Sequence, residues 1–138
     1  MAEPLVTDMD HGNRGGGPLH ANATRDVDGF MAAADKAVVE RLTSAPVAQT
    51  ADFAVALTDG WVTCNGAGTI VVTLPAPADS TGRVLEFKTT AAQLVNSASA
   101  NVVPITAGAA GTAILPATAG AWATLLSDGT NWVIMRRG

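Results

Sequence analysis

The sequence predicts a mainly β protein with an extended N-terminal arm, a short α-helix, and a compact antiparallel β-sandwich or barrel-like domain of about eight strands. Three observations support this prediction. Residues 1–29 have no hydrophobic period, residues 30–43 follow a helical one, and the rest carries short Val, Ile, Thr and Leu runs between turn dipeptides. We therefore divide the chain into an arm (1–29), a helical segment (30–45) and a β-domain (46–138).

The arm is rich in residues that disfavour regular structure. Its segment 11–20 reads HGNRGGGPLH, in which glycine leaves the backbone unrestrained and proline lacks an N–H donor. Such a segment becomes ordered only when another surface is supplied to it. His11 and His20 could bind a metal, but without cysteine or fixed geometry we interpret them as contacts to another protein. No cofactor is expected.

The helical segment has a start signal at Asp28-Gly29 and ends at Ser44-Ala45-Pro46. Its apolar residues Met31, Ala34, Val38 and Leu42 are spaced 3, 4 and 4 apart, which places them on a stripe about 80° wide. A lone helix of this length is marginal, because nucleation is costly below ~12–15 residues. The stripe therefore packs either on its own domain or as a short coiled-coil seam between copies.

The β-domain is expected to contain strands at 48–57, 61–65, 68–75, 83–90, 101–106, 112–116, 121–127 and 131–137. Asp59-Gly60, Asn65-Gly66 and residues 127–130 are interpreted as turns of hairpins, since such turns need a positive φ that glycine adopts freely. In the strand 83–90, Val84, Glu86 and Lys88 alternate with Leu85 and Phe87, which predicts opposite faces. Pro104 indicates an edge or a bulge.

Charge is scarce in the β-domain. From Thr43 onward the charged residues are Asp52, Asp59, Asp79, Arg83, Glu86, Lys88, Asp128, Arg136 and Arg137. An independent domain carries about a quarter charged residues, and uncharged strand edges invite pairing unless they are covered. We infer that copies of the chain cover one another in a homo-oligomer, with a trimer favoured.

Several function classes are disfavoured. The net charge of −4, with only Arg136 and Arg137 as adjacent cations, argues against nucleic-acid binding. No stretch approaches the ~18 apolar residues of a membrane span. The β-domain has no histidine to activate a nucleophile and no acid pair with a motif behind it, so we expect no enzyme, no catalytic residue and no metal site.

Two tryptophans are candidates for surface recognition. Trp61 and Trp132 could stack on sugars if they were exposed. Both lie in apolar strands, so a position in the core is the favoured interpretation of each. Cys64, the only cysteine, is interpreted as a small apolar strand residue.

The N-terminal segment resembles a known family. It carries His11-Gly12, Gly15-Gly16-Gly17, Leu19-His20 and Ala23-Thr24, then Gly29-Phe30-Met31 and Ala33-Ala34-Asp35-Lys36 before the helix ends. This order of motifs is similar to a segment of tail-fibre and other virion structural proteins of tailed bacteriophages. Thr73-Leu74-Pro75 and the run from Ser127 to Trp132 resemble loops and hairpins of phage fibre and decoration modules. Together these stretches span about two thirds of the chain.

The resemblance implies a structural role on a phage particle. In the family, the first segment joins a particle-bound end to a projecting trimeric part, which implies a docking arm at His11, Gly12, Gly15, Gly16, Gly17, Leu19 and His20. The partner would be the major capsid protein or another virion protein. The chain is much shorter than a tail fibre, which favours a head fibre or decoration protein on the capsid surface, made in the host bacterial cytoplasm. The alternative is a short tail fibre or adaptor that binds a host-surface receptor or glycan.

Overall fold

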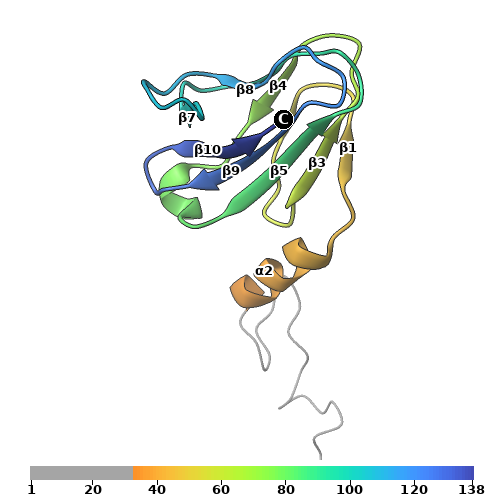
Figure 1. The fold of residues 1–138 in the computed structure, drawn as a ribbon. Helices are drawn as coiled ribbons and strands as arrows, with labels where there is room; N and C mark the ends of the chain where they lie inside the picture. The colour runs from red at the N-terminus through yellow and green to blue at the C-terminus, as the bar shows by residue number, and fades with distance from the viewer. Residues whose placement is uncertain (1–32) are drawn as a thin grey trace, which may run out of the picture. The chain divides into compact units, whose positions relative to one another are not determined.

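The computed structural model describes residues 33–138, so the predicted arm and the first residues of the predicted helix lie outside the described residues (Figure 1). The helices are α2 (Ala33–Thr43) and the 3-10 helix η3 (Pro77–Ser80). The strands are β1 (Val47–Gln49), β2 (Phe53–Ala54), β3 (Trp61–Cys64), β4 (Ile70–Thr73), β5 (Val84–Thr89), β6 (Val95–Ser97), β7 (Val102–Val103), β8 (Ala113–Leu115), β9 (Trp122–Ser127) and β10 (Trp132–Arg137). The division between the two units of the chain falls between Glu40 and Arg41, and the second unit, residues 41–138, contains all the strands.

Helix α2 follows the predicted helical segment over its described residues and ends at Thr43. Lys36 Nζ lies 3.5 Å from Glu40 Oε1, an (i, i+4) pair that supports the helix by a few tenths of a kcal/mol. Directly after the helix, the Ser44 hydroxyl donates a hydrogen bond to the carbonyl of Arg41 at 3.3 Å. Among the described residues, no helix is both long enough and apolar enough to cross a membrane.

The mainly β class is confirmed, but the predicted antiparallel arrangement is wrong. Two mixed sheets are present, one with the order β1-β3-β5-β9-β10-β7 and one with the order β2-β4-β6-β8. Only the pairs β5–β9, β9–β10 and β6–β8 are antiparallel. The other five pairings are parallel.

The parallel pairing follows from how the chain winds. From β1 to β6 the chain alternates between the two sheets, so each strand lies beside the strand two places earlier in the sequence. Val47 pairs with Val62, and Val62 pairs with Phe87. The number of residues from Val47 to Val62 therefore differs from the number from Val62 to Phe87. Paired positions do not recur at a constant interval in the sequence.

The predicted hairpins at Asp59-Gly60 and Asn65-Gly66 are wrong, because the strands on either side of each turn belong to different sheets. Asp59-Gly60 and Asn65-Gly66 lead the chain from one sheet to the other instead of reversing it within a sheet. Neither glycine has a positive φ, so their backbone conformation does not require glycine. Close contacts with other segments exclude a side chain at both positions. A Cβ at Gly60 would lie 2.8 Å from the Arg41 carbonyl oxygen, and one at Gly66 would lie 2.9 Å from the Thr50 carbonyl oxygen.

The remaining strand predictions hold in part. The predicted strand 48–57 is two strands, β1 and β2, which belong to different sheets, and β6 was not predicted. The last predicted hairpin is confirmed: β9 and β10 are antiparallel, and Gly129 between them has a φ of 91°. Pro104 directly follows β7, an edge strand of the six-stranded sheet, as a proline without an N–H donor should.

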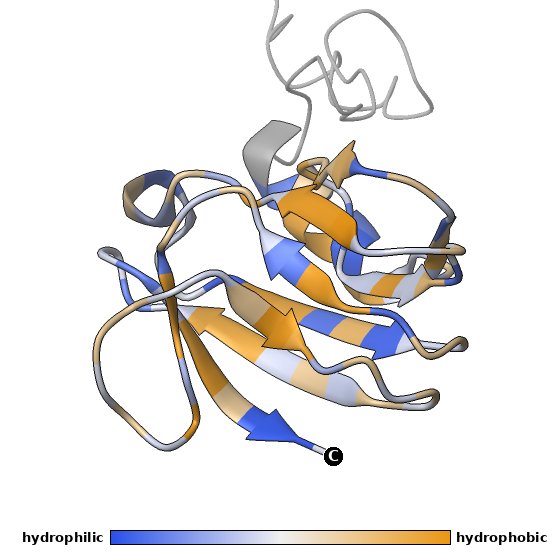
Figure 2. Cartoon of the chain, turned by 90° about the horizontal axis from the view of Figure 1, so that it is seen from above, coloured by the Kyte–Doolittle hydropathy of each residue, from blue (hydrophilic) through white to orange (hydrophobic). Residues whose placement is uncertain are grey.

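The hydrophobic core of unit 41–138 lies between the inner faces of the two sheets. The four-stranded sheet contributes Ile70, Val72, Val95, Ile114 and Leu115, and the six-stranded sheet contributes Val62, Leu85, Phe87, Leu125, Trp132 and Ile134. Figure 2 shows hydrophobic residues along most strands and a hydrophilic end of β10 beside the C-terminus. The core is thus closed by side chains from both layers.

Candidate functional site

The outer face of the six-stranded sheet carries the candidate site. On β5 the side chains of Leu85 and Phe87 are buried, while those of Val84, Glu86 and Lys88 point to the other face, as the alternation predicted. Register then aligns outward residues of neighbouring strands into rows. Three of these rows follow one another along β5, at Val84, Glu86 and Lys88.

The first row is aliphatic. Val84 on β5 pairs with Leu126 on β9, Leu126 pairs with Val133 on β10, and Val133 pairs with Val103 on β7. Val84 is 47% exposed, and the other three are half-buried. We call these four residues the aliphatic row. It crosses four adjacent strands without a charged side chain.

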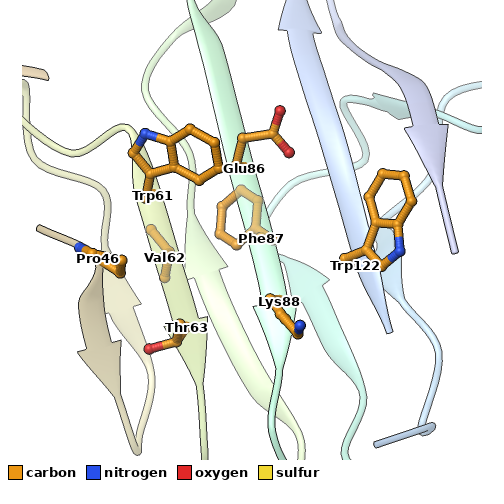
Figure 3. Close-up of a pocket in the computed structure, with 8 residues that line it drawn as sticks. All are labelled: Pro46, Trp61, Val62, Thr63, Glu86, Phe87, Lys88 and Trp122. Atoms are coloured by element: carbon orange, nitrogen blue, oxygen red, sulfur yellow. The ribbon is translucent and has the colours of Figure 1, made fainter. Parts of the chain in front are cut away.

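The other two rows are aromatic and polar. One contains Trp61, Glu86, Thr124 and Arg136, and the next contains Thr63, Lys88 and Trp122. Between the two tryptophans lies a groove of about 290 Å³ that is lined by Pro46, Trp61, Val62, Thr63, Glu86, Phe87, Lys88 and Trp122. Figure 3 shows Trp61 on β3 and Trp122 on β9, on the two sides of β5, with Glu86 and Lys88 between them. The groove therefore joins two indole rings to a carboxylate and an ammonium group.

The Glu86 carboxylate is held in place within the groove. The Thr124 hydroxyl lies 2.8 Å from both Glu86 carboxylate oxygens and donates to them. Arg136 Nη2 lies 3.8 Å from Glu86 Oε1, in a partly exposed pair whose contribution to stability is small. Lys88 is exposed and lines the groove, and it forms no ion pair with another residue of 33–138.

The backbone of Trp122 pairs with that of Gly138. The Trp122 backbone N–H donates to the Gly138 carbonyl at 2.8 Å, and the Gly138 backbone N–H donates back to the Trp122 carbonyl at 3.1 Å. A Cβ at position 138 would lie 2.5 Å from Trp122 Nε1, so only glycine fits there without moving the indole. Gly138 therefore packs directly against the Trp122 indole, which lines the groove.

The two tryptophans singled out in the sequence have opposite environments. Trp132 is fully buried, and its indole N–H donates to the Pro75 carbonyl at 3.0 Å, so the hypothesis that Trp132 is a surface recognition residue is wrong. Trp61 is 50% exposed, so the favoured core position is wrong for Trp61. Trp122, which is 39% exposed, was not predicted as a recognition residue. In the sequence, the only signal for an outward Trp122 was that it alternates with the apolar residues Ala123 and Leu125, which are buried in the structure.

The other predicted site residues are described only in part. The docking arm from His11 to His20 and the seam residue Met31 lie outside the described residues, and the side chain of Ala34 is not described. Val38 is 46% exposed and Leu42 is 76% exposed. The seam between copies therefore stays a prediction.

The buried polar groups of the β-domain serve the fold. The Arg83 guanidinium is buried and donates to the carbonyls of Ala56 at 2.6 Å and Asp59 at 2.8 Å. Burial lowers the pKa of Arg83, the nearby Arg41 lowers it further, and Asp59 opposes both. Burial also raises the pKa of the Cys64 thiol to about 11, which leaves it protonated at neutral pH. Within residues 33–138 no group of three or more His, Cys, Asp or Glu side chains is placed to hold a metal ion.

Comparison with known proteins gives no relative. No family model, no curated protein and no solved structure matches the chain.

Proposed function

We propose that the protein is a structural component of a bacteriophage particle, a homotrimeric head fibre or capsid decoration protein that is anchored by its N-terminal arm. The order of motifs from His11 to Lys36 supports the phage assignment. The β-domain supports self-association, and the aliphatic row is the observation that carries this part of the proposal.

The aliphatic row is an apolar surface whose exposure to water is unfavourable. Val84, Leu126, Val133 and Val103 form a continuous apolar band across β5, β9, β10 and β7. Asp59 and Arg83 are buried, so they do not add to the surface charge. Of the remaining charged residues, Glu86, Lys88, Arg136 and Arg137 lie farther along the strands, and Asp52, Asp79 and Asp128 lie outside the strands. The band thus has the composition of a contact between copies.

The mechanism is mechanical. The glycine-rich arm gains order when it docks on the major capsid protein or another virion protein. The helices of three copies meet through Met31, Ala34, Val38 and Leu42, and the β-domains associate through the aliphatic row. Many copies on one lattice then bind by avidity, so that each single contact can be weak.

Localisation on particles tests the proposal. Purified particles of the phage that encodes the chain should carry it on the capsid surface, as cryo-microscopy or antibody labelling would show. A chain that begins at Thr43 keeps nearly all of unit 41–138 and should fold, but it should no longer decorate particles. Normal incorporation of the truncated chain would exclude the docking role, and absence of the full chain from particles would exclude the proposal.

A further inference from the structure

We propose that the groove between Trp61 and Trp122 is a binding site for an oligosaccharide whose pyranose rings stack on the two indoles. This inference goes beyond the structural role proposed above and does not depend on it. It rests on the exposure of the indoles, on their spacing, and on the polar groups between them.

The indoles are exposed where the fold does not need them. Trp61 is 50% exposed and Trp122 is 39% exposed, whereas Trp132 supplies the buried tryptophan of the core. Neither of the two outward indole N–H groups donates a hydrogen bond to any residue of 33–138, while that of Trp132 does. An indole has an apolar face and one polar N–H, and a sugar ring presents apolar C–H groups and hydroxyls to match them.

The spacing of the two rings suits more than one sugar. Trp61 pairs with Glu86 and Trp122 pairs with Lys88, so the tryptophans are two strands apart and two residues apart along the strands. Strand spacing and rise per residue then place their Cα atoms about 12 Å from each other. A ligand of two or three linked rings can reach both indoles, with β5 lying beneath it.

The polar groups between the rings favour a ligand rich in hydroxyls. Glu86 is oriented by Thr124, and its carboxylate keeps acceptor capacity beyond that hydrogen bond. Lys88 supplies ammonium donors, and the hydroxyl of Thr63 forms no hydrogen bond with another described residue. A purely apolar partner would desolvate these groups without replacing their hydrogen bonds, which is unfavourable. A second copy of the chain, which is the alternative occupant, offers few charged side chains for Glu86 and Lys88.

The site is also built in advance. Reciprocal backbone hydrogen bonds pair Trp122 with Gly138, the Gly138 backbone lies directly against the Trp122 indole, and the Thr124 hydroxyl orients the Glu86 carboxylate. Fixed groups lose less conformational entropy when a ligand binds. Another hollow of unit 41–138, beside Pro116, Thr118 and Arg137, is lined by neither an aromatic nor an acidic side chain.

The test is binding of the full-length protein to an array of bacterial surface polysaccharides, followed by titration of the oligosaccharide that binds best. Tryptophan fluorescence and calorimetry report the Kd. Loss of one stacking contact should raise the Kd about fivefold or more in Trp61→Ala and in Trp122→Ala. Glu86→Gln should also weaken binding. Ile105→Ala is the matched control, because Ile105 is 43% exposed and does not line the groove, and it should leave the Kd unchanged.

The outcomes separate the possible occupants. Binding that both tryptophan variants weaken supports the proposal. Failure to bind any glycan on the array overturns it, as does glycan binding that the variants leave unchanged. Sedimentation of the same samples detects a different occupant: if Trp61→Ala dissociates the protein and no glycan binds, the groove is a contact between copies. Tryptophan-dependent binding of single-stranded DNA without glycan binding would likewise overturn the proposal.

Discussion

Replacing Trp132 with phenylalanine should destabilise the protein, whereas the same replacement at Trp61 should not. Trp132 is fully buried, and its indole N–H satisfies the Pro75 carbonyl at 3.0 Å. Loss of this donor leaves a buried acceptor unpaired, which costs about 1–3 kcal/mol. The smaller ring also leaves a void that adds about 1 kcal/mol. We therefore expect the free energy of unfolding to fall by about 2–4 kcal/mol in Trp132→Phe.

Urea denaturation followed by far-ultraviolet circular dichroism measures this difference, at one fixed protein concentration because association adds to apparent stability. Trp61→Phe should stay within about 0.5 kcal/mol of the unsubstituted protein, since Trp61 is half exposed. Equal losses in the two variants, or no loss in Trp132→Phe, would refute the placement of the two tryptophans on opposite faces of the sheet.

Three further predictions concern polar and ionisable groups. Arg83→Met should lower the free energy of unfolding by about 2–4 kcal/mol, because two backbone carbonyls lose a charged donor; Arg137→Met on the surface is the control, and an equal effect of both would contradict the role of Arg83. Cys64 should resist thiol reagents at pH 8 until the protein unfolds, because it is fully buried and its pKa is about 11; rapid labelling of the folded protein would exclude this. Hydrogen bonds from the backbone N–H groups of Asn131 and Thr130 lower the pKa of Asp128 below 3.8, so its contribution to stability is present above that value and is lost as the pH falls through the lower folded value. A carboxyl titration by NMR that places this pKa at or above 3.8 would contradict the turn geometry.

Alternation within single strands was readable from the sequence. The side chains of Leu85 and Phe87 are buried and those of Glu86 and Lys88 face outward, as the period of two predicted. The hairpin at Asp128-Gly129 was also predictable, because an Asp-Gly dipeptide lies between two runs that favour strands. Gly129 has the positive φ that this turn requires.

The order of strands in the sheets was not readable. Asp-Gly and Asn-Gly dipeptides predict hairpins through the positive φ of glycine, but Gly60 and Gly66 serve close approach to a carbonyl of another segment. A lone sequence does not distinguish these two uses. The paired strands also lie at unequal distances along the chain, so the sequence contains no repeat that would reveal the parallel pairing.

The candidate site was predictable only in part, because alternation was readable from the sequence and the order of the strands was not. An outward position for Glu86 and Lys88 follows from alternation, but the groove needs Trp61 and Trp122 from two strands that lie on either side of β5. Since β3 pairs with β5 in parallel and β9 pairs with β5 in antiparallel, only the register brings the indoles together. Trp132 resembles the other two in sequence context, yet alternation on β10 turns it inward.

Sedimentation velocity of the full-length protein at low micromolar concentration tests the central claim that copies of this chain cover one another. We expect a single species of three chains, and Val84→Glu, which places a charge in the aliphatic row, should shift this species toward monomer. A folded protein that stays monomeric at this concentration would contradict association through the aliphatic row.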